Sequence, residues 1–160
     1  SWMKGYLTKV VDEYVSFVNV SRHMDRLGIT VNESIDPGFS SYNSALKILV
    51  RGSQGQQMTV GGVVFEDRHL RLTLVNDFHF EVEPNGNMLL ISNLDRPGVI
   101  GDLGQYLAKN GINISGFNLS RNVKGGKAMA VLSIDQGLNA QNLRELKELP
   151  NVESAKAIFI

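Results

Sequence analysis

Hydrophobic and polar positions follow two different patterns along this chain, and the change comes near residue 86. Before that point, four short segments rich in Val, Ile and Leu are separated by turn-forming residues: Ala45–Val50, Met58–Phe65, Leu70–Val75 and Phe78–Val82. This pattern predicts strands joined by hairpins, in a mostly antiparallel sheet. Ahead of them, helical spacing over residues 2–11 and 21–27 predicts one or two helices, and alternation over 29–35 predicts a further strand, followed by a turn at 36–38.

Four turn-forming residues at 84–87, Pro-Asn-Gly-Asn, mark the best candidate for a domain boundary. The pattern beyond them is regular, with strands at 88–94, 113–119, 128–134 and 152–160 and helices at 99–109 and 141–149. The order βαββαβ predicts a ferredoxin-like sandwich. The expected fold class is therefore α+β, with a mixed α/β domain over 1–86 and a βαββαβ domain over 87–160.

Composition limits the classes of function. Sixteen Lys and Arg balance sixteen Asp and Glu, so no net charge draws the chain to nucleic acid or an anionic membrane. The absence of cysteine excludes disulfides, thiolate nucleophiles and Cys-ligated metals. No apolar run is long enough to span a bilayer, which favours a cytoplasmic protein. The chain begins with Ser1, and its apolar pattern is already running at Trp2, so we expect a piece of a longer chain.

The strongest candidate site is the segment Asn93-Leu94-Asp95-Arg96-Pro97-Gly98, where a strand leads into a helix. Pro97 suits a first helical turn. Gly98 and Gly101 leave the backbone N–H groups accessible, and a helix N-terminus attracts a carboxylate or phosphate. Asp95 accepts from an ammonium group, while Asn93 and Asn113 donate or accept. Together these groups complement a zwitterionic amino acid. The structural alternative is that Asp95 caps the helix and that the two asparagines satisfy backbone groups at strand ends.

Other motifs in the sequence are weaker candidates for a functional site. The spacing Gly98-x-x-Gly101-x-x-Gly104 lacks the G-x-G pair of a dinucleotide loop. The sequence Gly52-Ser53-Gln54-Gly55 matches a bare GxxG but lies between predicted strands, which indicates a hairpin. A set of basic residues on neighbouring predicted strands forms either an anion site or a solvated face: Lys47, Arg51, Arg68, His69 and Arg71. The three histidines lack metal-like spacing, and no nucleophile–base pair is present, so we predict no catalytic and no metal residue.

Residues 87–160 resemble the ACT domain, a βαββαβ module that binds amino acids and regulates metabolic enzymes. The resemblance is clearest in Asp95-Arg96-Pro97-Gly98 and Gly111-Ile112-Asn113-Ile114. Residues 4–86 resemble the intervening domain of the longer form of the D-3-phosphoglycerate dehydrogenase family. Three segments carry that match: Lys4-Gly5-Tyr6-Leu7, residues 15–20, and the stretch from Gly61-Gly62-Val63-Val64 through His79-Phe80.

This resemblance implies feedback regulation by L-serine, bound between the ACT domains of two subunits of a homo-oligomer. The implied contacts are Asn93, Asp95, the turn Pro97-Gly98-Val99, and Asn113. It also implies that the NAD-dependent oxidation of 3-phosphoglycerate, the first step of serine synthesis, belongs to the parent enzyme and not to these residues, which need no cofactor. Two alternatives remain open: the regulatory part of an iron–sulfur L-serine dehydratase, and a stand-alone amino-acid-binding ACT module.

Overall fold

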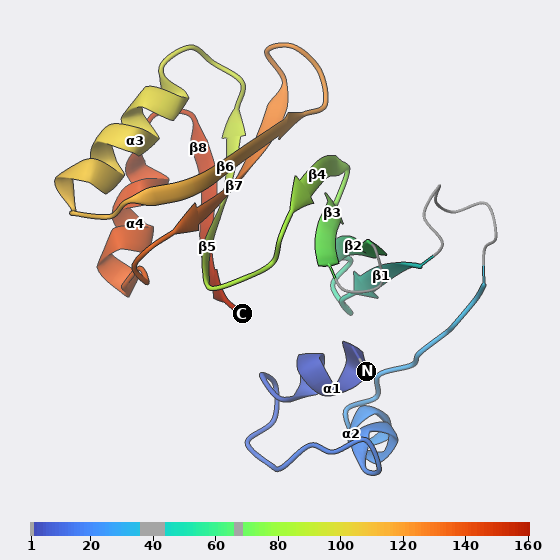
Figure 1. Ribbon diagram of the computed structural model, residues 1–160. Coiled ribbons are helices and arrows are strands. Elements are labelled where there is room, and N and C mark those ends of the chain that lie inside the picture. Colours follow the sequence, from blue (N-terminus) through green and yellow to red (C-terminus); the bar gives the residue numbers. More distant parts are fainter. Residues whose placement is uncertain (1, 36–43, 66–68) are drawn as a thin grey trace. The chain divides into compact units, whose positions relative to one another are not determined.

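The computed structural model describes residues 2–35, 44–65 and 69–160 (Figure 1). The chain divides into two compact units, residues 1–38 and 39–160. The predicted turn at 36–38 and the link at 66–68 lie outside the described residues. The predicted domain boundary at 84–87 falls inside the second unit, between its two sheets.

The first unit contains two short helices, α1 (Trp2–Leu7) and α2 (Val20–Arg26). Its core is a small apolar cluster of Leu7, Val15, Val20 and Met24. The helix α2 ends as its glycine predicts: Gly28 has φ +67°, and the amide of Ile29 donates to the carbonyl of Met24 at 2.9 Å.

The strand predicted over residues 29–35 is wrong. These residues form no regular structure; Ile29 and Val31 pack against the apolar cluster, and Ile35 is 96% exposed. Alternation therefore reflects local packing here. A strand needs a neighbour to take its backbone hydrogen bonds, and the described residues of this unit contain no other strand.

The second unit opens with a four-stranded antiparallel meander. Its strands are β1 (Ala45–Arg51), β2 (Gln57–Phe65), β3 (His69–Val75) and β4 (Phe78–Val82), paired in chain order. All four predicted strands are confirmed within a residue at each end. The GxxG segment is a hairpin, closed by the amide of Gly55 donating to the carbonyl of Gly52 at 3.1 Å.

The ACT-like half follows in the predicted order: β5 (Asn87–Leu94), α3 (Val99–Lys109), β6 (Ile114–Arg121), β7 (Lys127–Ile134), α4 (Ala140–Glu148) and β8 (Val152–Phe159). Its sheet has the order β6-β7-β5-β8, and all neighbours are antiparallel. The ferredoxin-like prediction is confirmed. Because β5 and β6 both run antiparallel to β7, they point the same way, and β6 and β8 are the sheet edges.

Both faces of this sheet are covered within the second unit. On one face, Leu89 and Ile91 pack with the buried side chains of α3 and α4, and Figure 1 shows both helices on that side. On the other, Met88 and Leu90 share a cluster with Phe78 of the meander. This explains why the apolar run of β5 is continuous, since a strand buried on both faces has no polar side.

Candidate functional site

The loop from β5 to α3 leaves the start of the helix open. Gly98 is the N-cap residue with φ +100°, a conformation that L side chains rarely adopt, and no side chain within the described parts of the chain caps α3. Val99, 2% exposed, anchors the first turn in the core. Pro97 therefore lies ahead of the helix rather than in its first turn, because the chain turns at Gly98. The helix start keeps the anion-attracting character predicted for it.

Asn93 sits at the end of β5, on the face of the sheet that α3 covers, and is 4% exposed. Its Nδ2 donates to the carbonyl of Leu94 at 2.8 Å. Its Oδ1 is buried and has no hydrogen-bond partner. A buried acceptor left unpaired costs about 1–3 kcal/mol, so it needs an explanation. A ligand donor, such as an ammonium or hydroxyl group, is one.

Asp95 holds two loops together and does not cap α3. Its Oδ2 accepts from Arg121 Nη1 at 2.8 Å and from the amide of Gly125 at 3.0 Å. The Gly125 amide, followed by the Arg121 guanidinium, lowers the pKa of this carboxyl below its ordinary value. We call Asp95, Arg121 and Gly125 the carboxylate clamp. The clamp joins the β5–α3 loop to the β6–β7 hairpin.

Asn113 lies at the other end of the sheet. Neighbouring Ile114 pairs with Ile134, which also pairs with Asn87 at the start of β5. An eight-residue strand spans about 25 Å, so Asn113 and the clamp of one chain are far apart. The Nδ2 of Asn113 donates to Asp135 Oδ2 at 2.7 Å. Of the predicted site residues, one chain brings together Asn93, Asp95 and the 97–99 turn, but not Asn113.

Arg121, Gly125 and Asp135 had no place among the predicted site residues. Arg121 and Gly125 belong to β6 and its hairpin, 26 and 30 positions along the chain from Asp95. Local periodicity cannot detect such pairs. The available signal was limited to Arg121, two residues past the predicted end of the strand 113–119, and Asp135, one residue past the predicted strand 128–134.

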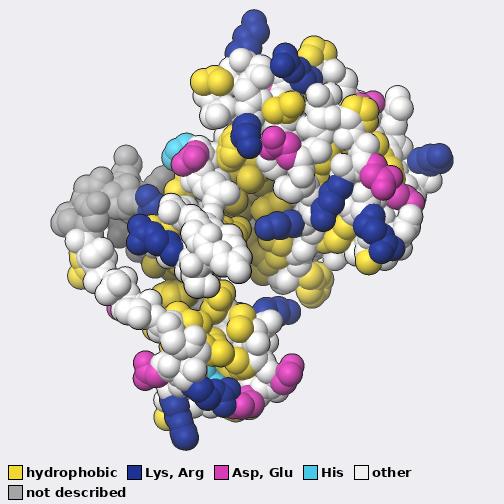
Figure 2. Space-filling view, turned by 180° about the vertical axis from the view of Figure 1, so that it is seen from behind, with side chains coloured by type: hydrophobic (Ala, Val, Ile, Leu, Met, Phe, Trp, Pro, Cys, Tyr) yellow, Lys and Arg dark blue, Asp and Glu magenta, His cyan; other side chains and the backbone are white. Residues whose placement is uncertain are grey.

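Of the five basic residues predicted on neighbouring strands, the structure describes Lys47, Arg51, His69 and Arg71. Lys47 and Arg51 lie on one face of β1, but Arg71 is paired with Glu83 at 3.0 Å, and Arg68 lies outside the described residues. In the described ranges, no three His, Asp or Glu side chains could hold a metal, and no helix is long and apolar enough to cross a membrane. On the face shown in Figure 2, basic and acidic side chains are interspersed.

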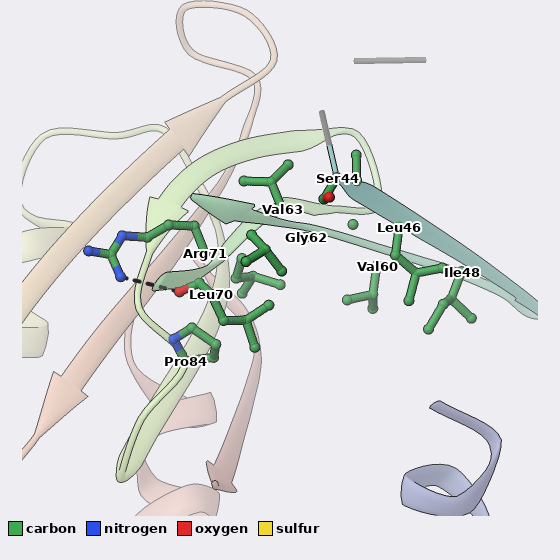
Figure 3. Close-up of a pocket in the computed structure, with 13 residues that line it drawn as sticks. Ser44, Leu46, Ile48, Val60, Gly62, Val63, Leu70, Arg71 and Pro84 are labelled. Atoms are coloured by element: carbon green, nitrogen blue, oxygen red, sulfur yellow. Dashed lines mark hydrogen bonds between the residues drawn. The ribbon is translucent and has the colours of Figure 1, made fainter. Parts of the chain in front are cut away.

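A hollow of about 540 Å³ lies over the meander, away from these polar groups (Figure 3). Its lining is largely apolar, with Leu46 and Ile48 from β1, Val60 from β2 and Leu70 from β3. Such a surface has few groups with which to orient a small zwitterion. We call Asn93, Asp95 and the Pro97–Val99 turn the polar corner. This corner, at the start of α3, remains the candidate site.

Comparisons with known proteins agree with the βαββαβ fold of this part of the chain. Residues 87–151 match the family described as the ACT domain, and this part of the chain is an ACT domain. The chain is 31% identical to D-3-phosphoglycerate dehydrogenase of Bacillus subtilis over 98% of its own length and 30% of that protein. It is 29% identical to the D-3-phosphoglycerate dehydrogenase of Synechocystis, over 98% of its own length and 28% of that protein. It is 26% identical to the D-3-phosphoglycerate dehydrogenase of Methanocaldococcus jannaschii, over 99% of its own length and 30% of that protein. The chain thus spans about 30% of the length of these curated relatives.

Proposed function

We propose that these residues are the regulatory region of a D-3-phosphoglycerate dehydrogenase and that the ACT domain binds L-serine as a feedback inhibitor. Similarity to dehydrogenases over almost the whole chain favours this assignment over the serine dehydratase and the stand-alone module. In this proposal the oxidation of 3-phosphoglycerate by NAD takes place in other parts of the enzyme. The residues described above then act only by sensing the product of the pathway.

The observation that carries the ligand proposal is the unpaired Oδ1 of Asn93 beside an uncapped helix start. The amides at the start of α3 suit the carboxylate of serine, and a buried acceptor suits a donor group of the same molecule. Asn93, Asp95 and the Pro97–Val99 turn make up this half of the site.

The other half, at Asn113, comes from a second copy of the chain. β6 is an edge strand, and edge strands extend a sheet readily. If two β6 strands pair antiparallel across a two-fold axis, the start of one lies beside the end of the other. This arrangement carries Asn113 of the second copy to the sheet end that holds the clamp of the first. Two such sites form for each pair, and serine stabilises the paired state by binding across it.

Calorimetry with L-serine on wild type, Asn93→Ala and Asn113→Ala tests this proposal. Wild type should bind in the micromolar to millimolar range expected for so small a ligand, and each variant should bind at least about tenfold more weakly. Circular dichroism checks that the variants are folded, and D-serine is the matched ligand control.

Mixing the two variants then tests the two-copy geometry. In an equal, equilibrated mixture, half of the pairs contain one subunit of each kind, and one of the two sites in such a pair has both asparagines. Roughly a quarter of the wild-type binding capacity should return on mixing. If no capacity returns, the site lies within one chain and the geometry is wrong. If wild type binds no serine, the ligand proposal fails.

A further inference from the structure

The first strand of the meander, β1, has an open edge. It pairs with β2 on one side, and in the part of the chain that the structure describes no strand lies on its other side. Along this strand Leu46 is 52% exposed, and Leu49 and Val50 are each 39% exposed. An edge strand with several exposed apolar side chains readily pairs with a further strand. The edge of β1 is therefore a candidate interaction surface.

Every second residue of β1 directs its backbone groups to this open side. The amide of Val64 donates to the carbonyl of Ser44 at 3.0 Å, and the amide of Gly52 donates to the carbonyl of Gln56 at 2.8 Å. In an antiparallel ladder, the residues bonded to one neighbouring strand alternate with those bonded to the other, so the even-numbered residues of β1 bond β2. The residues whose N–H and C=O groups point outward are the odd-numbered ones: Ala45, Lys47, Leu49 and Arg51.

The positions of two cations favour one register for the pairing of two β1 strands. Across a two-fold axis perpendicular to the sheet, each face stays on its own side, so residues whose numbers differ by an even number oppose each other. If Ile48 lies on the axis, the strands overlap over all of Ala45–Arg51, and Lys47 lies opposite Leu49. If Lys47 or Leu49 lies on the axis instead, Lys47 meets a second Lys47 or Arg51. Like charges directly opposite each other destabilise a sheet, so the register with Ile48 on the axis is favoured.

We propose that β1 pairs antiparallel with β1 of a second copy in this register, which joins two four-stranded meanders into one continuous sheet. The outward-directed residues of the two strands then form about eight backbone hydrogen bonds. On the side of the hollow, where Figure 3 shows Leu46 and Ile48 with Val60, Leu46 meets Val50 and Ile48 meets its own counterpart. This interface uses a different edge from the β6 pairing proposed for the ACT sheet, so either can form without the other.

Single cysteines can report this pairing, because the chain contains no cysteine of its own. Ile48→Cys places two thiols opposite each other in a pair whose Cα atoms are about 4.5 Å apart, within the range of a disulfide. Val50→Cys is the matched control, because its two copies lie four residues apart along the strands, about 14 Å. Oxidation with copper–phenanthroline should cross-link at least about tenfold more of the first variant than of the second. A mixture of Leu46→Cys and Val50→Cys should cross-link where neither variant does alone.

The charge at position 49 gives a second readout, without any cysteine. Leu49→Lys sets a cation opposite Lys47 of the other copy, whereas Leu49→Glu sets an anion there, and both remove the same apolar side chain. By sedimentation equilibrium at low salt, the lysine variant should associate at least about tenfold more weakly than the glutamate variant. Circular dichroism checks that both are folded, and both leave β6 unchanged.

The outcomes separate the possible errors. If Ile48→Cys does not cross-link, or cross-links no better than Val50→Cys, β1 does not pair with a second copy. Preferential cross-linking of Leu49→Cys would overturn the proposed register, as would equal association of the lysine and glutamate variants. Serine binding depends on the ACT domain and its β6 edge, so its presence or absence leaves this test unaffected.

Discussion

At the scale of single residues, the polar corner is built from groups that do more than their type suggests. Asp95 is a clamp, Asn93 holds an unpaired oxygen, and Gly98 turns the chain into α3 with φ +100°. Each of these roles depends on an atom contributed by backbone or by another strand. Residue type indicated a polar helix start that complements a zwitterionic amino acid, but it did not indicate these partners.

Alanine substitutions at Gly98, the N-cap residue of α3, and at Gly104, within α3, should change the stability of the protein in opposite directions. Gly98→Ala should destabilise the protein by about 1–2 kcal/mol, because alanine is strained at positive φ. Gly104→Ala should stabilise it by about 0.5–1 kcal/mol, because Gly104 is inside α3 and a Cβ there meets nothing within 4 Å. Urea unfolding measures both. A stabilising Gly98→Ala would contradict the conformation of the loop.

The clamp also predicts a dependence of stability on pH. The pKa of Asp95 is lower in the folded protein than its ordinary value of 3.8, so its contribution is present above that value and is lost as pH falls through the lower, folded value. Melting temperatures of wild type and Asp95→Asn should therefore differ most above pH 4 and converge toward pH 2. A difference that stays constant over this range would mean that the carboxylate charge is not what holds the hairpin.

At the scale of elements, the apolar periodicity determines where strands and helices lie, and a small polar network fixes α3 against α4. Tyr106 Oη donates to Glu145 Oε2 at 2.7 Å and accepts from Asn142 Nδ2 at 3.2 Å. The hydrogen bond from Gln141, followed by that from Tyr106, lowers the pKa of Glu145. The helices are thus joined by directed bonds as well as by leucines.

Tyr106→Phe should lower the free energy of unfolding by about 1 kcal/mol, the usual net value of one hydrogen bond. Hydrogen exchange should show faster opening of α4, which buries only Leu146 fully, than of α3. Phe159→Leu, a change at an exposed ring on β8, is the control for surface aromatic substitutions. An unchanged unfolding curve for Tyr106→Phe would mean that the network contributes nothing net.

At the scale of the whole second unit, the two sheets share a core. Val75, Phe78 and Val82 of the meander pack with Met88, Leu90, Met129 and Val131 of the ACT sheet. The predicted boundary at 84–87 separates two hydrophobic patterns in the sequence. The sheets on its two sides nevertheless bury their apolar faces against each other. An ACT sheet without the meander would expose an apolar face.

Phe78→Ala should therefore cost about 3–5 kcal/mol and lower the protection of β5 and β7 as well as that of β4. Amide hydrogen exchange, read strand by strand, measures this directly. Phe159→Ala, at a ring that is 74% exposed, should change stability by less than about 0.5 kcal/mol. Loss of protection confined to β4 would show that the two sheets unfold independently.

The sequence by itself determined the order and extent of the strands and helices in residues 45–160, because apolar periodicity and turn residues are local properties of the chain. Through the motif around Asp95 it also indicated the polar corner and its helix start. Only the tertiary structure decided that Arg121 and Gly125 donate hydrogen bonds to Asp95 and that the buried Oδ1 of Asn93 has no partner. It also decided that Asn113 donates to Asp135 at the far end of the sheet. Strand order and register determine those neighbours. They arise from packing between segments that are distant in the chain, which no local pattern records.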